Sequence, residues 1–452
     1  REQRYLMQSN GGVMPFSGVT AGGNTVHTLL SGPAAGVQGA CHLLAGIQTF
    51  RNLITMDIGG TSCDIAFIEG GTALEISECS IDGRQIDVPS LDIITIAAGG
   101  GAIARVDRGG FLVVGPESAG AVPGPACFGR GGSVPTITDA YVECGLVSAE
   151  NFLGGTQTID PAAAHRAIET HLAKPLQISC VDAAAGIMRV INARIADEIR
   201  LQAAKKAVDL SKFTLVAFGG AGPVHAAAVA EELGIGAVLV PFSPGAFSAL
   251  GLLCSDIIHD FLRSDLSDLD ELTSEAVASH FTTLKGEALA ALAAEKLRPQ
   301  DCEFIHEFDM RYAGQGYEIR VGLGDAKGAI DLAALRERFH RLHELHHGHS
   351  ARDRTVEIVS YRLRARIPTR KVALQAKAHW PVAGGTAGTR EIRFGSAAAA
   401  STPVMSRADL MRAGSQAGPA IIVQFDTTTV IPPGWNARAD TAGNVIIKRN
   451  ES

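Results

Sequence analysis

The chain has 452 residues, of which 46% are hydrophobic and 19% are charged, and its mean hydropathy is +0.15. A globular chain of this length can bury a large core and is long enough for two or three domains. The formal net charge of −7, without any run of lysine or arginine, argues against nucleic acid as the main partner.

The sequence disfavours a membrane-spanning segment and a disulfide framework. The uncharged stretch 233–255 is interrupted by prolines and glycines, whereas a spanning helix needs about 20 uninterrupted apolar residues. The eight cysteines are scattered without Cys-x-x-Cys pairs, which favours reduced, mostly buried thiols. We therefore expect a cytoplasmic protein without a membrane partner, without disulfides and without cysteine-ligated zinc.

The first chemically informative segment is 53–68, in which an apolar run ends at Asp57 and a second begins at Asp64. Two β-rich runs joined by a glycine pair predict a hairpin. Its turn, Gly-Gly-Thr-Ser at 59–62, offers backbone N–H groups and hydroxyls to a phosphate. Because carboxylates repel phosphate, the two aspartates indicate a bridging Mg²⁺ or a positioned nucleophile. A plain hairpin with two capping aspartates is the alternative.

Three consecutive glycines, Gly99, Gly100 and Gly101, follow a strand-like run at 91–96. They permit the close approach of a ligand, and they also suit a bulge or a tight junction between lobes. We favour the ligand role by a small margin.

Residues 214–241 have the pattern strand, glycine loop, helix and strand. The loop Gly219-Gly-Ala-Gly-Pro223 places Pro223 in the first turn of the helix, where proline is tolerated. Such a unit puts a helix N-terminus at the carboxyl end of a strand, where α/β folds bind nucleotides. The spacing is not Gly-x-Gly-x-x-Gly, so a nicotinamide site is not expected. His225, just after the loop, either touches the nucleotide or simply packs there.

The remaining patterns define the expected domains. Isoleucines four residues apart predict a packed helix within 181–207, and a second apolar stripe predicts a helix over 273–297. Beyond it we expect a hairpin between 303 and 323, a helix over 331–347, a strand over 355–367 and a β-rich end. The alternation of strands and helices before residue 260 indicates an α/β domain at 1–260, and we place a smaller α+β domain at 270–452.

Five histidines crowd the segment 340–349, and His343-Glu-Leu-His-His347 matches the His-Glu-x-x-His pattern of zinc proteases. Two histidines four residues apart on a helix can chelate a metal. The neighbouring arginines and the expected helix end at Gly348 favour a solvated helix face instead.

Together these segments resemble the actin-like ATPases and, more closely and nearly end to end, the hydantoinase A/5-oxoprolinase family. The motifs that carry the resemblance are Gln8-Ser-Asn-Gly-Gly-Val-Met14, Leu30-Ser-Gly-Pro-Ala-Ala-Gly36, Met56-Asp-Ile-Gly-Gly-Thr-Ser62, Ala98-Gly-Gly-Gly101, Val114-Gly-Pro-Glu-Ser-Ala-Gly120, Pro123-Gly-Pro-Ala-Cys127, Ala217-Phe-Gly-Gly-Ala-Gly-Pro223, Arg311-Tyr-Ala-Gly-Gln-Gly-Tyr317 and Gln424-Phe-Asp-Thr-Thr-Thr429.

This resemblance implies an actin-like ATPase lobe of ribonuclease H-like fold, followed by a smaller α+β domain. It implies that ATP and Mg²⁺ serve the hydrolysis of a cyclic amide, such as a hydantoin, N-methylhydantoin or 5-oxoproline, through phosphorylation of the amide oxygen. A separate B-type subunit would then hydrolyse the activated ring. The alternatives are the beta subunit of a ketone carboxylase of the acetone carboxylase type and a nucleotide-binding or assembly module without activity of its own.

The resemblance also implies roles for individual residues. Asp57 orients Mg²⁺ or its waters, and Asp64 supports the loop or the outer shell of the metal, so these two are the predicted catalytic residues. The predicted nucleotide-binding residues are Gly59, Gly60, Thr61, Ser62, Gly99, Gly100, Gly101, Gly219, Gly220, Ala221, Gly222 and Pro223. The family's other acidic phosphate loop belongs to an N-terminal lobe that this sequence lacks, so we expect the chain to be inactive when isolated.

Overall fold

The computed structural model describes residues 4–16, 24–46, 50–76, 79–81, 83–86, 88–150, 152–324, 330–372, 388–394 and 399–450. The chain divides into two compact units that interleave in sequence. The first unit consists of Arg1–Leu29 and Ser255–Lys371, and the second consists of Leu30–Cys254 and Val372–Ser452.

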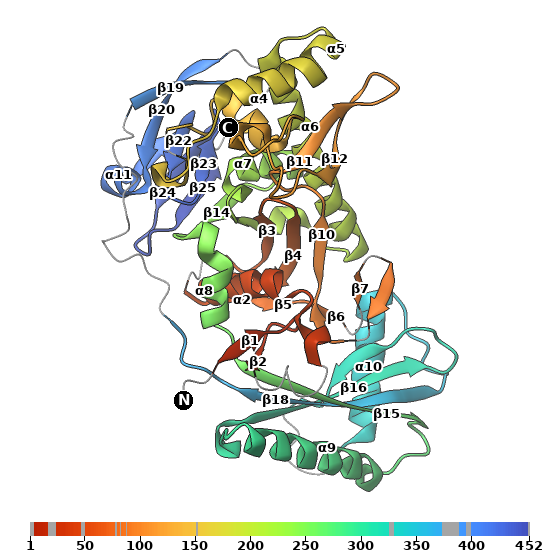
Figure 1. Ribbon diagram of the computed structural model, residues 1–452. Helices are drawn as coiled ribbons and strands as arrows, with labels where there is room; N and C mark the ends of the chain where they lie inside the picture. Colours follow the sequence, from red (N-terminus) through yellow and green to blue (C-terminus); the bar gives the residue numbers. More distant parts are fainter. Residues whose placement is uncertain are drawn as a thin grey trace. The chain divides into compact units, whose positions relative to one another are not determined.

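A nine-stranded sheet of mixed direction forms the centre of the second unit (Figure 1). Strand β3 (Leu53–Ile58) pairs antiparallel with β4 (Cys63–Glu69) and parallel with β13 (Thr214–Phe218), which pairs parallel with β14 (Ala237–Val240). The α/β class predicted from the sequence is confirmed. The other strands of this sheet are β5 (Thr72–Ala73), β10 (Ile93–Ile96), β21 (Ser415–Ala417), β24 (Trp435–Ala439) and β25 (Val445–Arg449).

Helices cover both faces of this sheet. The core on one face joins Ile54, Met56 and Ile58 of β3 to α6 (Cys180–Lys205) and α7 (Gly222–Leu233). The predicted isoleucine stripe lies in this core, and its four members are fully buried: Ile187, Ile191, Ile195 and Ile199.

The opposite face carries α2 (Ser31–Gly46) and α8 (Phe247–Leu253). The rings of Phe218 and Phe247 lie 4.9 Å apart on this face. The remaining helices of the unit are α3 (Ile137–Glu143), α4 (Pro161–Ile168), α5 (Lys174–Leu176) and α11 (Arg407–Ala413). None of the described helices combines the length and the apolar character that a membrane crossing requires.

The C-terminal segment returns to the central sheet, because β25 pairs antiparallel with β14. A four-stranded sheet of β19 (Gly388–Ile392), β20 (Ala400–Ser406), β22 (Ala420–Val423) and β23 (Thr428–Ile431) belongs to the same unit. The domains predicted at 1–260 and 270–452 are each continuous in sequence, whereas each compact unit joins two separate segments of the chain. The two-stranded pairs are β6 (Glu75–Ile76) with β9 (Ser90–Leu91), β7 (Cys79–Ile81) with β8 (Arg84–Ile86), and β11 (Ala102–Val106) with β12 (Leu112–Ser118).

The first unit is a six-stranded sheet with helices α9 (Ser274–Ala294) and α10 (Leu332–His347) packed on its core. Both helices and the hairpin of β16 with β17 were predicted from the sequence, although α9 ends at Ala294 rather than at Leu297. The strands, in sheet order, are β1 (Tyr5–Met7), β2 (Val13–Pro15), β15 (Ile257–Asp268), β18 (Val356–Ile367), β16 (Glu303–Tyr312) and β17 (Ile319–Gly322).

Helices α2 and α8 approach each other so closely that only glycine fits at Gly251. A Cβ atom there would lie 1.8 Å from the carbonyl oxygen of Ala35. We expect Gly251→Ala to lower the free energy of unfolding by about 1–3 kcal/mol, as overpacking does. The matched control is Gly286→Ala on the exposed side of α9, where no atom lies within 4 Å of the added carbon. It should raise stability by up to about 1 kcal/mol. Urea unfolding checks both, and equal effects of the two substitutions would contradict the packing argument.

Candidate functional site

The predicted hairpin is present, and it places its two carboxylates side by side. Asp57 pairs with Asp64 across the β3–β4 ladder, so both side chains lie on the same face of the sheet. The four-residue turn is closed by the N–H of Gly59, which donates to the carbonyl of Ser62 at 3.2 Å. The turn therefore leaves the end of the sheet with little side-chain bulk.

The three consecutive glycines pack directly against this turn. The N–H groups of Gly100 and Gly101 donate to the carbonyls of Gly59 and Gly60 at 3.0 and 2.7 Å. A Cβ atom at Gly99 would lie 2.4 Å from the backbone of Thr61. These glycines thus form a tight backbone contact within the second unit, and their ligand role stays a prediction.

The loop after β13 approaches the same strand end from the other side. Phe218 is in register with Asp57, and the chain then turns through Gly219 with a φ of 77°. A Cβ atom at Gly219 would lie 2.4 Å from both Asp57 Oδ1 and the carbonyl oxygen of Ile58, so the position requires glycine. Helix α7 then begins at Gly222 with Pro223 in its first turn, as the sequence predicted.

A cavity of about 260 Å³ joins these loops within the second unit. The predicted residues that line it are Gly59, Gly60, Gly100, Gly220 and Ala221. The predicted residues that adjoin it in sequence but do not line it are Asp57, Thr61, Ser62, Asp64, Gly99, Gly101, Gly219, Gly222 and Pro223.

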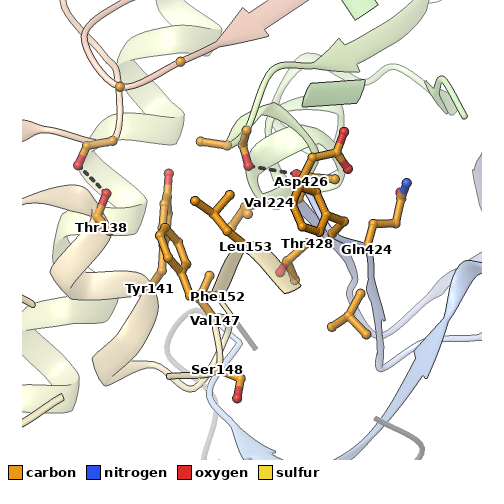
Figure 2. Close-up of a pocket in the computed structure, with 18 of the residues that line it drawn as sticks. Thr138, Tyr141, Val147, Ser148, Phe152, Leu153, Val224, Gln424, Asp426 and Thr428 are labelled. Carbon is orange, nitrogen blue, oxygen red and sulfur yellow. Dashed lines mark hydrogen bonds between the residues drawn. The ribbon is translucent and has the colours of Figure 1, made fainter. Parts of the chain in front are cut away.

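The rest of the wall is mainly apolar and aromatic, and apart from the motif at 424–429 no sequence pattern indicated it. In Figure 2, Thr138 and Tyr141 lie on one side of the cavity, and Gln424, Asp426 and Thr428 lie on the other. The apolar lining side chains are Phe128, Tyr141, Val147, Phe152, Leu153, Val224, Val423 and Phe425.

A buried carboxylate holds two parts of this wall together. Asp139 accepts hydrogen bonds from the backbone N–H groups of Ala126 and Cys127 at 3.2 and 2.8 Å. It also forms a capping box with Thr136 at the start of α3. Asp139 thereby ties the loop that carries Phe128 to the helix that carries Thr138 and Tyr141.

The C-terminal loop 424–428 lines the cavity and contacts both the glycine loop after β13 and the turn at 244–246. Thr427 donates through Oγ1 to the carbonyl of Gly220 at 2.8 Å. The N–H of Gly245 donates to Asp426 Oδ2, also at 2.8 Å. The sequence offered one signal for this role, the motif at 424–429, but the predicted boundaries assigned that motif to the other domain.

His225 lies behind the wall rather than in the cavity. Its side chain is fully buried, and the Tyr141 hydroxyl donates to Nε2 at 2.6 Å while Nδ1 donates to Asn192 Oδ1 at 2.6 Å. Burial lowers the pKa of His225 to about 4, so the imidazole is neutral at physiological pH. His225 therefore fixes the ring of Tyr141, which lines the cavity.

The environment of the two hairpin carboxylates disfavours their ionised form. Burial, followed by the charge of Asp64, raises the pKa of Asp57 to about 6. Burial also raises the pKa of Asp64, although the hydroxyls of Thr95 and Ser62 donate to its two oxygens and oppose the rise. Among the described residues, Ser248 donates a hydrogen bond to Asp57 at 3.2 Å. A divalent cation would offset the repulsion, so this pair fits the donor set of Mg²⁺.

The histidine-rich segment is only in part the solvated face that the sequence favoured, because His346, His347 and His349 are exposed. His340 and His343 are buried in the first unit, 3% and 0% exposed. Nδ1 of His343 donates to the carbonyl of His349 at 2.8 Å, and Nε2 lies 3.1 Å from the amide nitrogen of Gln315. With both ring nitrogens engaged, His343 has a structural role and is not available to a metal.

Comparison with known proteins identifies the family of the chain. The sequence model for hydantoinase/oxoprolinase matches residues 1–261, and the model for the hydantoinase/oxoprolinase C-terminal domain matches residues 267–448. The chain belongs to the hydantoinase/oxoprolinase family. The family resemblance inferred from the motifs is thereby confirmed.

Individual relatives in this family support the assignment. The chain is 33% identical to caprolactamase subunit alpha of Pseudomonas jessenii over 97% of this chain and 63% of that protein. It is 31% identical to the acetophenone carboxylase gamma subunit of Aromatoleum aromaticum, over 93% of this chain and 59% of that protein. The crystal structure of the ATP-dependent caprolactamase from P. jessenii matches with a TM-score of 0.82 and 32% identity, over all of this chain and 66% of that one. The chain thus spans less than two thirds of the length of these relatives.

The raised pKa of Asp57 predicts how stability depends on pH. A carboxyl whose pKa is higher in the folded state favours folding when protonated, and this contribution is lost as the pH rises from about 4 through about 6. Above that range the ionised, buried Asp57 should cost about 3 kcal/mol, and Asp57→Asn should recover it. At pH 4 the two proteins should be nearly equal in stability.

Urea unfolding between pH 4 and pH 8, without divalent cations, measures this difference. The matched control is Asp139→Asn, which should destabilise at neutral pH because that carboxylate accepts hydrogen bonds from buried N–H groups. A destabilised Asp57→Asn variant at pH 8 would contradict the electrostatic argument.

Proposed function

We propose that the cavity of the second unit binds the nucleotide of an ATP-dependent reaction. The observation that carries the proposal is the joining of two glycine loops, at 59–60 and 220–221, to an aromatic wall in one cavity. Backbone N–H groups at a turn free of side chains suit phosphate oxygens, and an apolar slot with aromatic rings suits a purine base. On this basis we also propose that the lobe around β3, β4 and β13 is of the actin-like, ribonuclease H-like type.

The reaction that we propose is the hydrolysis of a cyclic amide, such as a lactam, a hydantoin or 5-oxoproline, through phosphorylation of the amide oxygen. The match to an ATP-dependent caprolactamase supports this choice, because caprolactam is a cyclic amide. An amide carbonyl is a poor electrophile, and a phosphorylated oxygen makes the ring easier for water to open. The protein would act as the A-type subunit with a B-type partner, since the caprolactamase relative is itself one subunit.

Within this proposal the residues of the hairpin have two roles, phosphate binding and metal binding. Gly59, Gly60, Thr61 and Ser62 hold phosphate oxygens. Asp57 holds Mg²⁺ or its waters, and Asp64, whose two oxygens already accept hydrogen bonds from Ser62 and Thr95, supports Asp57 from the outer shell. Mg²⁺, when bound, neutralises the charge that develops on the transferred phosphoryl group.

The second candidate reaction is the carboxylation of a ketone. The match to an acetophenone carboxylase subunit supports this candidate. Both reactions activate a carbonyl oxygen with ATP, so the proposed nucleotide site serves either one. The substrate contacts that distinguish them, and the further lobe and partner subunit that we propose for the full-length protein, lie outside this site.

Gly220→Val should prevent nucleotide binding without unfolding the protein. Gly220 lines the cavity, and the nearest atom to an added Cβ is the carbonyl oxygen of Asp426 at 3.8 Å, so the side chain has room in the fold but occupies ligand space. Fluorescence titration with a labelled ATP analogue should show at least about a tenfold loss of affinity, or 1.4 kcal/mol.

Gly219→Val is the matched control, because its Cβ would collide with Asp57 and Ile58 and should destabilise the fold itself. Unchanged affinity in a folded Gly220→Val protein would move the nucleotide site elsewhere.

The catalytic proposal is tested with the full-length A-type subunit and its B-type partner, on a panel of lactams, hydantoins and ketones. We expect substrate-dependent ADP release with a cyclic amide, and Asp57→Asn should lower kcat by about 10²-fold or more while changing ATP affinity much less. Bicarbonate-dependent turnover of a ketone would select the second candidate. Normal turnover by Asp57→Asn would refute the role of this residue, and equal turnover by the isolated 452-residue chain would refute the need for a further lobe.

A further inference from the structure

Three side chains from three helices form a connected chain away from the nucleotide cavity. Glu143 is the last residue of α3, His165 lies in α4, and Cys180 is the first residue of α6. Nδ1 of His165 lies 3.1 Å from both carboxylate oxygens of Glu143, and Nε2 lies 3.8 Å from the Cys180 sulfur. The imidazole is therefore held between a carboxylate and a thiol.

This order of groups is the one that activates a nucleophile. A carboxylate that accepts the Nδ1 proton fixes the tautomer of the imidazole, so the lone pair of Nε2 points to the thiol. A base in that position can take the thiol proton when the sulfur reacts. We propose that Cys180 is a reactive thiol, with His165 as its base and Glu143 as the group that orients His165, and that peroxides oxidise it to a sulfenic acid.

The surroundings of the sulfur are consistent with a thiol that needs a base. Burial, followed by the charges of Glu143 and Glu169, raises the pKa of Cys180, and Lys174 opposes this effect. The resting sulfur is therefore protonated at neutral pH. Once a thiolate forms, the N-terminus of the 26-residue helix α6 stabilises its negative charge.

Access to the site is open. Cys180 is partly exposed, and the side chain of His165 is 53% exposed, so a small oxidant reaches both. Five of the eight cysteines are buried, and the two other partly exposed ones, Cys41 and Cys302, have no imidazole among their hydrogen-bond partners in the described residues. Cys180 is thus distinguished from the other partly exposed cysteines by its imidazole neighbour.

The proposed reaction with hydrogen peroxide balances without another reactant. Nε2 of His165 takes the thiol proton, and the sulfur lone pair attacks one peroxide oxygen. The O–O bond breaks, and the departing hydroxide takes the proton back from His165 as water. Sulfur is oxidised from thiol to sulfenic acid, and the peroxide oxygens are reduced.

A metal site is the competing explanation, because the three residue types are all metal ligands and their ligand atoms lie within 4.8 Å of one another. However, Glu143 and Cys180 contact opposite nitrogens of one imidazole. An ion bound by Cys180 and Nε2 would leave Glu143 hydrogen-bonded to Nδ1 and outside the first shell. Two protein ligands are too few for a structural zinc site, so we favour the reactive thiol.

The experiment treats the 452-residue protein with hydrogen peroxide in the presence of a chelator, traps sulfenic acid with a dimedone probe, and measures labelling of each cysteine by mass spectrometry. Cys302 is the internal control. We expect Cys180 to be labelled at least about tenfold faster than Cys302, and His165→Asn to remove most of that difference. Glu143→Gln should lower the rate less, because it misorients the base without removing it.

His171→Asn is the matched control variant, since His171 is an exposed histidine in the neighbouring helical turn; it should leave the rate unchanged. Thermal unfolding and the labelling of Cys302 show whether each variant is folded. Equal labelling of Cys180 and Cys302, or an unchanged rate in folded His165→Asn, would overturn the proposal. Submicromolar Zn²⁺ binding, lost equally in Glu143→Gln and Cys180→Ser, would replace it with a metal site.

Discussion

The candidate site depends on backbone packing that only glycine permits. At the end of β3, the turn of the hairpin is contacted on one side by Gly99–Gly101 and on the other by Gly219, and in both places a Cβ atom would lie 2.4 Å from another group. Three segments that are far apart in sequence thus meet backbone to backbone. Their N–H and carbonyl groups bond to one another, as between Gly101 and Gly60, and this contact fixes the shape of the turn.

The pleat of β3 then separates two chemical environments. Alternate side chains point to opposite faces, so Ile58 joins the core with α6 and α7, whereas Asp57 faces α8 and accepts a hydrogen bond from Ser248. The aromatic wall lies on the first side, where Val224 of α7 and Tyr141 of α3 line the cavity. An apolar slot and a carboxylate pair therefore adjoin the same turn without competing for the same space.

Local patterns predicted the hairpin, the loop after β13 and the isoleucine stripe of α6, because short-range spacing determines each of them. Patterns did not reveal what depends on distant partners. In the sequence Tyr141 looks like any helical residue, and its role depends on its contacts with His225 and the cavity. His343 looks like an exposed polar residue, and it is buried because α10 packs on its sheet. The place of β25 in the sheet that carries the site likewise depends on its pairing with the distant strand β14.

The charge arrangement adds an energetic coupling to this geometry. Two carboxylates lie on adjacent strands, and burial is the main cause that raises the pKa of each; at Asp57 the charge of Asp64 adds to the effect. A cation that binds there offsets part of the unfavourable energy of the ionised pair, whereas an anion that approaches the turn alone adds to it. The hairpin should therefore take up an anionic ligand and a divalent cation as a pair. The glycine contacts make the pairing effective, because a turn held rigidly on both sides cannot relax to separate the charges.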